Sequence, residues 1–511
     1  MKKRILEIII VSLIFILALF LRTYQLGEIP KGIHIDEAGM AYDAFCLGNF
    51  GVDRYLNRFP VYLLNYGAGQ SALYAYLAAV FVRFLGIQTY VIRIPAVLLN
   101  MCALFAIYFI GRKHIGKNFA ALLLLLATIN PWNIMASRWG LDCNLLAPCS
   151  VIAMWLLFRA DGKWYEYVFA GIGIGITLYT YAISYIILPI FLLLIISYML
   201  YTKKISIKNT IILGCVVFIF ALPLMLMILV NNGIIPEINS FITIPKLIGF
   251  RGSEIGLGNI LENIKCIPSL FSYDGFSYNS IKEFGTVYYF KIPLIVIGLI
   301  VEIYNLVINI KNKEFKVGSG ILVFFISVFI TLLLITKPNI NRMNAIYFPL
   351  VFFQFSAIKF LFEKTNRKVF YIIAGATVIL YGYSFISFTN YYFNEYPEEF
   401  KYQAYFEDDL TNAIATAIGR PELNEKKVNI LTETHEPYIY TLLVNRPSPY
   451  DFNSQKEEDN SWGKYVFNVK EIDEDMVYII KDDGDFIAKL VQNGFEYFDI
   501  GAYKIFYINN K

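Results

Sequence analysis

The sequence contains few charged residues for its length. Of its 511 residues only 16% are Asp, Glu, Lys or Arg, and 57% are hydrophobic. An average soluble domain is about 25% charged, so this chain has too few charges to cover a soluble surface of its size. Its mean hydropathy of +0.54 and its long apolar runs indicate a multi-span α-helical membrane protein.

Other signals are also missing. Three histidines exclude a His-rich metal cluster, and the six cysteines show no CxxC spacing. Several of these cysteines lie in apolar runs, so they are interpreted as small hydrophobic residues rather than a zinc site or a disulfide framework. The sequence shows no internal repeat and no low-complexity tract. The net charge of +4 is spread over loops, and no nucleic-acid partner is expected.

The first apolar run, residues 5–21, follows Lys2-Lys3-Arg4. This arrangement resembles the start of a signal peptide, but the residues that follow, "RTYQLGEIP", contain no small-residue cleavage site. We therefore expect a retained first helix.

Eleven apolar segments have a length suited to crossing a membrane. They are residues 5–21, 91–110, 119–136, 145–160, 165–181, 184–202, 210–230, 291–310, 318–336, 344–362 and 369–389. A twelfth run, 72–86, is short and contains Arg83.

Loop charge decides whether the run 72–86 crosses. Cytoplasmic loops are enriched in Lys and Arg. If 72–86 does not cross, five basic loops fall on the inner side together with Lys2-Lys3-Arg4; they begin near Arg112, Arg159, Lys203, Lys311 and Lys364. We therefore predict about eleven spans, a cytoplasmic N-terminus, and a re-entrant or juxtamembrane helix at 72–86. Residues 22–90 and 231–290 then form long outer loops.

The last part of the chain differs in composition from the rest. It is charged and contains short β-rich runs at 428–433, 476–481 and 503–510, with helix-like stretches at 407–419 and 485–493. We predict a transmembrane domain over 1–390 and a small extracytoplasmic α/β domain over 391–511. The α/β domain contains no glycine-rich phosphate loop and is interpreted as a structural or acceptor-docking cap.

The stretch "KGIHIDEAGMAY" places Asp36 and Glu37 side by side, just after the first apolar run. A solvated loop pair is one interpretation. The other is a general base at the outer membrane face, with repulsion between neighbouring carboxylates able to perturb the pKa of one of them.

The segment "NPWNIMASRWGLDCN" places Ser137, Arg138, Asp142 and Asn144 at the end of an apolar run, on the same predicted side as Asp36. A charge at that depth is a functional candidate by default. Arg138 suits bidentate contact with phosphate, and an interfacial, snorkelling arginine is the alternative.

Several loops rich in aromatic and polar residues share the predicted outer side. Tyr181 lies in "LYTYAISY", Gln70 in "NYGAGQSALYAY", and Arg342 and Asn344 in "NINRMNAIYFPL". Tyrosines are common at membrane interfaces on general grounds. The same residues also suit sugar rings, so the pattern favours a lipid-linked phosphate substrate whose tail stays in the bilayer.

Together these stretches resemble the polytopic lipid-linked sugar transferases of the protein O-mannosyltransferase type, glycosyltransferase family 39, within the GT-C superfamily. The resemblance covers roughly residues 20–400. It rests on "IPKGIHIDEAGMAYDAF", "LYAYLAAVFVRFLGIQTYVIRIPAVL", "NPWNIMASRWGLDCNLL", "LYTYAISYIILPI", "DGFSYNSIKEFGTVYYFKIP" and "NRMNAIYFPLVFF", taken in that order.

The resemblance implies a GT-C helical bundle with a juxtamembrane helix in the first outer loop. It also implies that Asp36, with Glu37, is the catalytic acidic pair, and that Ser137, Arg138 and Asp142 match the family's Ser-Arg motif and following acid. The implied donor is a polyprenyl-phosphate sugar, and the implied location is a prokaryotic cytoplasmic membrane. Many relatives carry a basic residue before the first-loop Leu-Tyr, where this chain has Gly67-Ala68-Gly69-Gln70. A lysine contact to phosphate is therefore not expected, and Gln70 is left to contact donor or acceptor.

The predicted reaction is glycosyl transfer with inversion. Asp36 removes the proton of an acceptor hydroxyl, and Arg138 and Arg342 stabilise the departing polyprenyl phosphate. A divalent metal is optional in this scheme, with Asp36, Glu37 and Asp142 as its available carboxylates. The acceptor is left open between protein, lipid and glycan. A transporter or flippase of a lipid-linked sugar is the alternative, although no inverted repeat supports it, and a non-catalytic sensor is a third interpretation.

Overall fold

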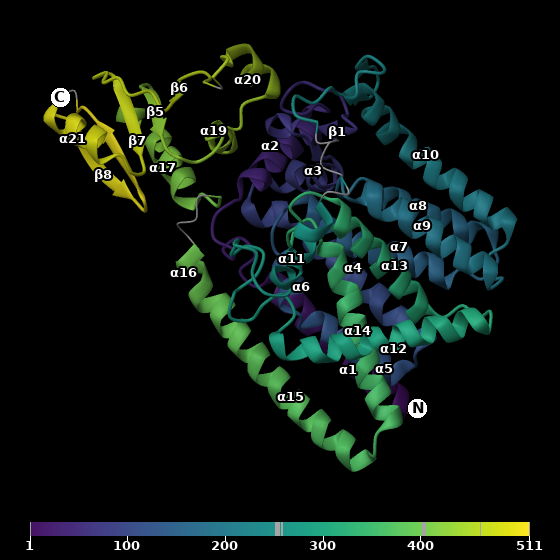
Figure 1. Ribbon diagram of the computed structural model, residues 1–511. Coiled ribbons are helices and arrows are strands. Elements are labelled where there is room, and N and C mark those ends of the chain that lie inside the picture. The colour runs from purple at the N-terminus through teal and green to yellow at the C-terminus, as the bar shows by residue number, and fades with distance from the viewer. Residues whose placement is uncertain (1, 251–255, 257–258, 401–404, 460, 510–511) are drawn as a thin grey trace.

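The computed structural model describes the chain except residues 1, 251–255, 257–258, 401–404, 460 and 510–511 (Figure 1). Parts of the predicted outer loop 231–290, of the predicted domain 391–511 and of the predicted strand run 503–510 therefore lie outside the described residues. The rest forms a helical bundle with a small sheet domain at one end.

Within the described part of the chain, nine helical segments are long and apolar enough to cross a membrane. They contain α1 (Lys2–Thr23), α4 (Thr89–His114), α7 (Leu146–Arg159), α9 (Ser184–Tyr201), α10 (Ile207–Asn231), α12 (Ile292–Lys311), α13 (Val317–Leu334), α14 (Tyr347–Lys364) and α15 (Arg367–Asn390). Each of these nine helices matches one of the predicted spans. Helices α4, α7, α13 and α14 form the buried centre, whereas α1, α10, α12 and α15 are mostly exposed, as expected for helices that face lipid.

The other two predicted spans form helices shorter than 18 residues. Residues 119–136 divide into α5 (Lys117–Thr128) and α6 (Pro131–Ala136). The break occurs at Asn130, whose side chain caps α6 by accepting from the backbone N–H of Asn133, with Pro131 as the first helical residue. Such a proline favours a new helix start over continuation. The segment 165–181 forms the 15-residue helix α8 (Trp164–Leu178).

The first long loop contains two helices, α2 (Ile35–Phe50) and α3 (Leu73–Leu85). Helix α3 corresponds to the run 72–86. Its 13 residues give a length of about 20 Å, against about 30 Å for a bilayer core. This length agrees with the prediction that the segment does not cross. Between α2 and α3 lies a short antiparallel hairpin of β1 (Tyr62–Leu63) and β2 (Gln70–Ser71).

The second long loop contains the antiparallel pair β3 (Ile238–Asn239) and β4 (Thr243–Ile244), followed by α11 (Ile260–Phe271). It is joined to the first loop, because the backbone N–H of Val61 donates to the carbonyl of Thr243 and that of Thr243 donates to the carbonyl of Arg58. The two loops therefore form one structure at the same end of the bundle.

The C-terminal domain is built on a mixed five-stranded sheet in the order β6-β5-β7-β9-β8. Its strands are β5 (Lys427–Leu431), β6 (Tyr465–Phe467), β7 (Met476–Ile480), β8 (Glu496–Ile500) and β9 (Tyr503–Tyr507), and its helices are α17 (Asp408–Gly419), α18 (Pro421–Asn424), α19 (Tyr438–Asn445), α20 (Pro449–Gln455) and α21 (Gly484–Gln492). Strand β5 is parallel to both β6 and β7, whereas β9 is antiparallel to β7 and β8.

The connection to this domain is helical as far as residue 400. Helix α15 continues through a π-helical turn (Tyr391–Glu395) into α16 (Tyr396–Phe400), and it runs along one side of the bundle toward the sheet domain (Figure 1). The boundary predicted at residue 390 therefore falls within a continuous helical segment, and the sheet begins well after it.

Candidate active site

Asp36 lies in the first turn of α2, where the residues before the helix fix its orientation. His34 caps the helix: its Nδ1 accepts from the backbone N–H of Asp36 at 3.1 Å. The Asp36 side chain is 37% exposed, in contrast to its buried neighbours. A carboxylate is favoured at a helix N-terminus, so this position suits an accessible base.

The imidazole of His34 is enclosed by rings. Its centroid lies 5.0 Å from Phe406, 5.3 Å from Trp139 and 5.3 Å from Tyr278. Burial lowers the pKa of His34 below its ordinary value of 6.5, against the opposing charges of Asp36 and Glu37. The imidazole is therefore neutral at pH 7, as its role as hydrogen-bond acceptor in the helix cap requires.

The segment leading into the C-terminal domain supports the same turn. The backbone N–H of Ile35 donates to the carbonyl of Tyr405 at 3.1 Å, and that of Glu407 donates to the carbonyl of Ile33 at 3.2 Å. Two segments nearly 400 residues apart in sequence thus pair directly beside Asp36.

Asp36 contacts a network of buried polar side chains. Asn65 Nδ2 donates to Asp36 Oδ1 at 3.4 Å, and Asn65 Oδ1 accepts from Arg54 Nη2 at 2.9 Å. The guanidinium of Arg54 is fully buried and forms a bidentate pair with Asp43, at 3.0 and 2.8 Å. This chain of contacts, Asp43–Arg54–Asn65–Asp36, is called the support chain below.

Gly39 leaves room for the support chain. A Cβ atom at this position would lie 2.5 Å from Arg54 Nη2 and 2.6 Å from Asn65 Oδ1. Any larger residue on this turn of α2 must therefore displace the chain.

Glu37 lies in a different environment from Asp36. It is completely buried and forms a salt bridge with the buried Arg93, with Nε to Oε1 at 3.0 Å. The backbone N–H of Gly140 also donates to Oε1 at 2.6 Å. Because its oxygens are engaged within the protein, this geometry does not support the predicted catalytic role and supports Glu37 as an anchor of the first loop.

Arg138 is also occupied by protein groups. Its Nη1 donates to the carbonyl of Leu21 at 2.8 Å, and its Nη2 contacts the carbonyls of Tyr24, Gln25 and Ile29. The side chain is buried beside the rings of Tyr392 and Phe393. The predicted phosphate clamp is therefore not supported at Arg138, which instead holds the end of α1 and the chain that follows it.

A cavity of about 430 Å³ brings together three of the predicted site residues, Asp142, Tyr181 and Arg342. One wall comes from the hairpin of the first loop, at Tyr62 and Gly69. The apolar part of the lining comes from α9, α10 and nearby loops. Its members are Ile183, Ile186, Met227, Ile228, Leu247, Phe250 and Ile335. A cavity with both polar and apolar lining beside membrane helices matches an amphipathic lipid phosphate. It is called the bundle cavity below.

The polar groups of the bundle cavity are held in place. Arg342 Nη1 donates to the carbonyl of Thr336 at 2.7 Å. Burial raises the pKa of the Tyr181 hydroxyl well above 10. The nearby Asp142 and Cys143 also raise this pKa, whereas Arg342 lowers it. Tyr181 is therefore a neutral hydroxyl at any physiological pH.

Asp142 connects the bundle cavity to Asp36. The two carboxylates are close enough to interact electrostatically, and Gln70 is within hydrogen-bonding reach of Asp142. The backbone N–H groups of Ser71 and Cys143 also donate to Asp142, at 3.2 and 2.8 Å. The structure therefore brings Asp36, Gln70, Asp142, Tyr181 and Arg342 into one region.

The remaining predicted substrate contacts serve the backbone. Ser137 Oγ donates to the carbonyl of Ile134, Asn144 Nδ2 donates to the carbonyl of Trp139, and Asn344 Nδ2 donates to the carbonyl of Cys143. All three residues are buried and do not line the bundle cavity. They shape the loop that presents Asp142, and their predicted contact with substrate is not supported.

A search of the described residues for three or more His, Cys, Asp or Glu side chains placed to hold a metal ion finds no such group. Glu37 is paired with Arg93, which leaves Asp36 and Asp142 as the neighbouring carboxylates of the three predicted from sequence.

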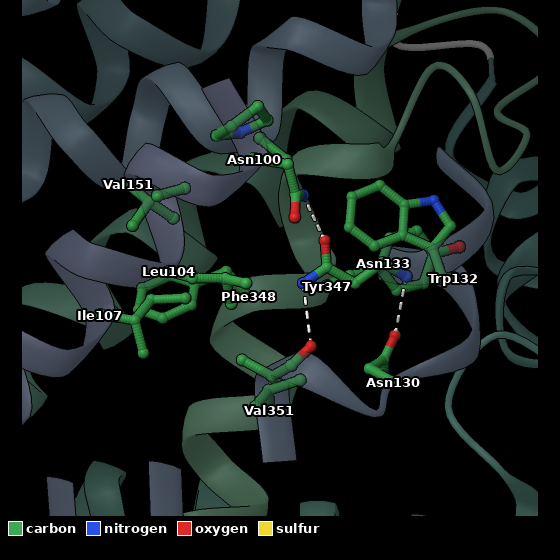
Figure 2. Close-up of a pocket in the computed structure, with 14 residues that line it drawn as sticks. Asn100, Leu104, Ile107, Asn130, Trp132, Asn133, Val151, Tyr347, Phe348 and Val351 are labelled. Atoms are coloured by element: carbon green, nitrogen blue, oxygen red, sulfur yellow. Dashed lines mark hydrogen bonds between the residues drawn. The ribbon is translucent and has the colours of Figure 1, made fainter. Parts of the chain in front are cut away.

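A second cavity lies inside the bundle and is much smaller, about 30 Å³ (Figure 2). Its lining includes three asparagines. Asn100 Nδ2 donates to Asn133 Oδ1, and Asn133 donates its backbone N–H to Asn130 Oδ1 at 3.1 Å. Arg22 Nε in turn donates to Asn100 Oδ1 at 2.6 Å. This volume suits about one water molecule, so the cavity belongs to a structural polar network and not to a substrate site.

Arg54, Asn65 and Gly39 are not among the site residues predicted from sequence. No local sequence pattern indicates these residues, because Arg54 pairs with Asp43 and Asn65 only after the chain has folded back against α2. The cis Ile29–Pro30 bond was likewise not indicated by the sequence.

Comparisons with known proteins agree with this architecture. A family model described as dolichyl-phosphate-mannose-protein mannosyltransferase matches residues 70–228. A comparison with curated protein sequences gives no match.

Solved structures give matches over nearly the whole chain. ArnT from Cupriavidus metallidurans in the apo state has a TM-score of 0.55 at 10% identity, covering 99% of this chain and 97% of that one. The same protein bound to undecaprenyl phosphate has a TM-score of 0.54 at 11% identity, covering 99% and 98%. An oligosaccharyltransferase from Archaeoglobus fulgidus in complex with Zn and sulfate has a TM-score of 0.53 at 14% identity, covering 86% of this chain and 61% of that one.

The fold is therefore the GT-C fold. Residues 70–228 are in addition similar to the dolichyl-phosphate-mannose-protein mannosyltransferase family model.

Proposed function

We propose that the protein transfers a sugar from a polyprenyl-phosphate carrier to an acceptor hydroxyl with inversion, on the outer face of a prokaryotic cytoplasmic membrane. The observation that carries the proposal is the position of Asp142, which lines the bundle cavity and interacts with the partly exposed Asp36. This position supports a donor phosphate bound in the bundle cavity near the candidate base.

In this scheme the donor enters the bundle cavity. Its prenyl chain follows the apolar lining on α9 and α10, and its phosphate approaches Arg342. The undecaprenyl phosphate bound in ArnT supports a carrier of this class. Arginine suits a phosphate whose negative charge increases during the reaction.

Asp36 removes the proton from the acceptor hydroxyl as that oxygen attacks the anomeric carbon. The bond between the anomeric carbon and the phosphate oxygen breaks, and polyprenyl phosphate departs with the bonding electrons. A new glycosidic bond of opposite configuration results, and the proton on Asp36 passes to water. Phosphate is a good leaving group, so the scheme requires no separate general acid.

Purified protein in detergent is the material for the test. It is incubated with a panel of radiolabelled polyprenyl-phosphate sugars and with extracts of candidate acceptors. Covalent transfer of label, with release of polyprenyl phosphate, is the expected result. Movement of intact lipid-linked sugar between leaflets of proteoliposomes, without transfer, would contradict the proposal and favour a transporter.

A further inference from the structure

A third cavity, in the C-terminal domain, is not explained by the donor site. Its volume is about 370 Å³, and it is lined mainly by the segment that follows β5, together with Phe467 and Asn468 at the end of β6 and Asp459 before β6. These strands are parallel neighbours that end at Leu431 and Phe467. From β5 the chain passes to β6 on one side and then to β7 on the other. Crevices at the carboxyl ends of parallel strands, where the strand order diverges, are common ligand sites in α/β folds.

The walls of this cavity, called the domain cavity below, are held by side-chain contacts. The backbone N–H of Thr432 donates to Asn468 Oδ1 at 3.0 Å. The buried Thr434 donates through Oγ1 to Glu407 Oε1 at 2.5 Å, and Lys481 Nζ donates to the same carboxylate oxygen at 3.2 Å. The loop after β5 is thus fixed to α17 and to the sheet, so the cavity is formed before a ligand binds.

The chemistry of the lining is acidic and rich in hydrogen-bonding groups. It contains Glu433, Glu436 and Asp459 together with His435, two threonines and Asn468. The described lining residues include no lysine or arginine; the half-buried Lys456 interacts with Glu436 from outside the cavity. Carboxylates and amides bind sugar hydroxyls and amines, and the carboxylates repel phosphates and other anions.

The domain cavity lies next to the candidate base. The ring of His435 is 6.4 Å from that of Tyr66, whose hydroxyl donates to the carbonyl of Ile35 at 2.8 Å. Tyr438, which lines the cavity, contacts Arg54 of the support chain, with Nη1 to the hydroxyl oxygen at 3.5 Å. Asp36 therefore has the bundle cavity on the side of Asp142 and the domain cavity on the side of Tyr66.

We propose that the domain cavity binds the acceptor, and that the acceptor is a neutral or amine-bearing saccharide and not a phosphate-rich polymer. This inference rests on the proposed function, since it gives the two substrates separate entrances to Asp36. The lipid donor enters from the bundle, and a hydrophilic saccharide enters from the C-terminal domain.

The test measures binding and transfer with the full-length protein in detergent. Four probes are titrated: a glucosamine tetrasaccharide, a neutral glucose tetrasaccharide, an anionic galacturonic acid oligosaccharide and a threonine-rich peptide. The variant is Glu433→Lys, at an exposed lining position, and the matched control is Glu474→Lys, at an exposed position of the same domain outside the cavity. Both are surface changes that preserve folding.

We expect the glucosamine or glucose probe to bind to wild type and Glu474→Lys, and to bind to Glu433→Lys at least about tenfold more weakly. The donor KM is expected to be equal in all three proteins. Equal saccharide affinity in Glu433→Lys and wild type would overturn the proposal, as would binding of only the anionic or peptide probe.

The proposal that the domain cavity binds the acceptor and the proposed glycosyl transfer can be refuted independently. Transfer to saccharide by wild type, with an unchanged acceptor KM in Glu433→Lys, would refute the domain cavity and leave the glycosyltransferase intact. Saccharide binding that depends on Glu433, with no transfer from any donor, would support the cavity and refute the reaction.

Discussion

Asn65 connects Asp36 to Arg54 through a single side-chain amide. Its Nδ2 donates to Asp36 Oδ1 at 3.4 Å while its Oδ1 accepts from Arg54 Nη2 at 2.9 Å. The amide orientation is thereby fixed, because Arg54 can only donate. Asp36 is thus oriented by a buried chain of side chains, although its own carboxylate is accessible.

Gly39→Ala tests the support chain without changing any of its members. The added methyl would lie 2.5 Å from Arg54 Nη2, so Arg54 and Asn65 must move. We expect a loss of stability of about 1–3 kcal/mol and a fall in kcat with little change in donor KM. Gly214→Ala is the control, since a Cβ there meets nothing within 4 Å. A Gly39→Ala enzyme with wild-type kcat would show that the chain does not position Asp36.

Arg138→Ala distinguishes a structural arginine from a phosphate clamp. Removal of the guanidinium leaves four carbonyls without this donor, two of them in buried contacts, which is expected to cost at least about 3 kcal/mol of stability. Arg112→Ala, which breaks the pair of a half-exposed arginine with Glu7, should cost less than Arg138→Ala because it removes fewer hydrogen bonds. Thermal unfolding in detergent measures both. A stable Arg138→Ala protein with a greatly raised donor KM would restore the clamp.

Arg342→Gln tests the phosphate end of the bundle cavity. We expect the donor KM to rise about tenfold or more, because a charge-assisted contact to phosphate is lost, while the acceptor KM is unchanged. Lys337→Gln, an exposed cation on the same loop, is expected to leave both constants unchanged. Equal effects of the two variants on donor KM would indicate a general influence of loop charge and not a contact.

Stability should depend on pH through Asp53. Burial, with the charge of Asp43 adding, raises the pKa of Asp53 from 3.8 to about 7. The folded protein therefore binds this proton more tightly than the unfolded chain. The resulting stabilisation is complete below about pH 4 and is lost as the pH rises through 7, by at most about 1.4 kcal/mol per pH unit.

Melting temperatures at pH 5 and pH 8 measure this effect. We expect the decrease between the two to be smaller in Asp53→Asn, which has no carboxylate to ionise, than in wild type. The exposed Asp475→Asn is the control and should keep the wild-type difference. An identical decrease in wild type and Asp53→Asn would exclude Asp53 as the source.

Much of the fold could be predicted because its signals are local. The apolar runs give nine of the long helices, and the β-rich runs near 428, 476 and 503 coincide with β5, β7 and β9. Strands β6 and β8 were overlooked, since Tyr465–Phe467 is short and Glu496–Ile500 alternates little. Residues 119–136 were predicted as one span because apolar composition outweighed the helix break at Asn130-Pro131.

The site was predictable only in part. The sequence motifs predicted Asp36, Asp142, Tyr181 and Arg342 as site residues, and the structure places these four residues in one region. The residue type and its position in the sequence do not distinguish an arginine that binds a ligand from one that donates to backbone carbonyls. The geometry therefore does not support the roles predicted for Arg138 and Glu37, because their partners lie in α1, the chain after it and α4. The same long-range pairing conceals Arg54 and Asn65 in sequence.

The most direct measurement compares transfer of radiolabelled sugar by wild type, Asp36→Asn and Glu28→Gln, an exposed acid of the same loop. Removal of a general base typically lowers the rate by about 10²–10⁴-fold. The account predicts that Asp36→Asn is folded, binds donor with the wild-type KM and loses activity to this extent, while Glu28→Gln retains it. Normal turnover by Asp36→Asn would contradict the account.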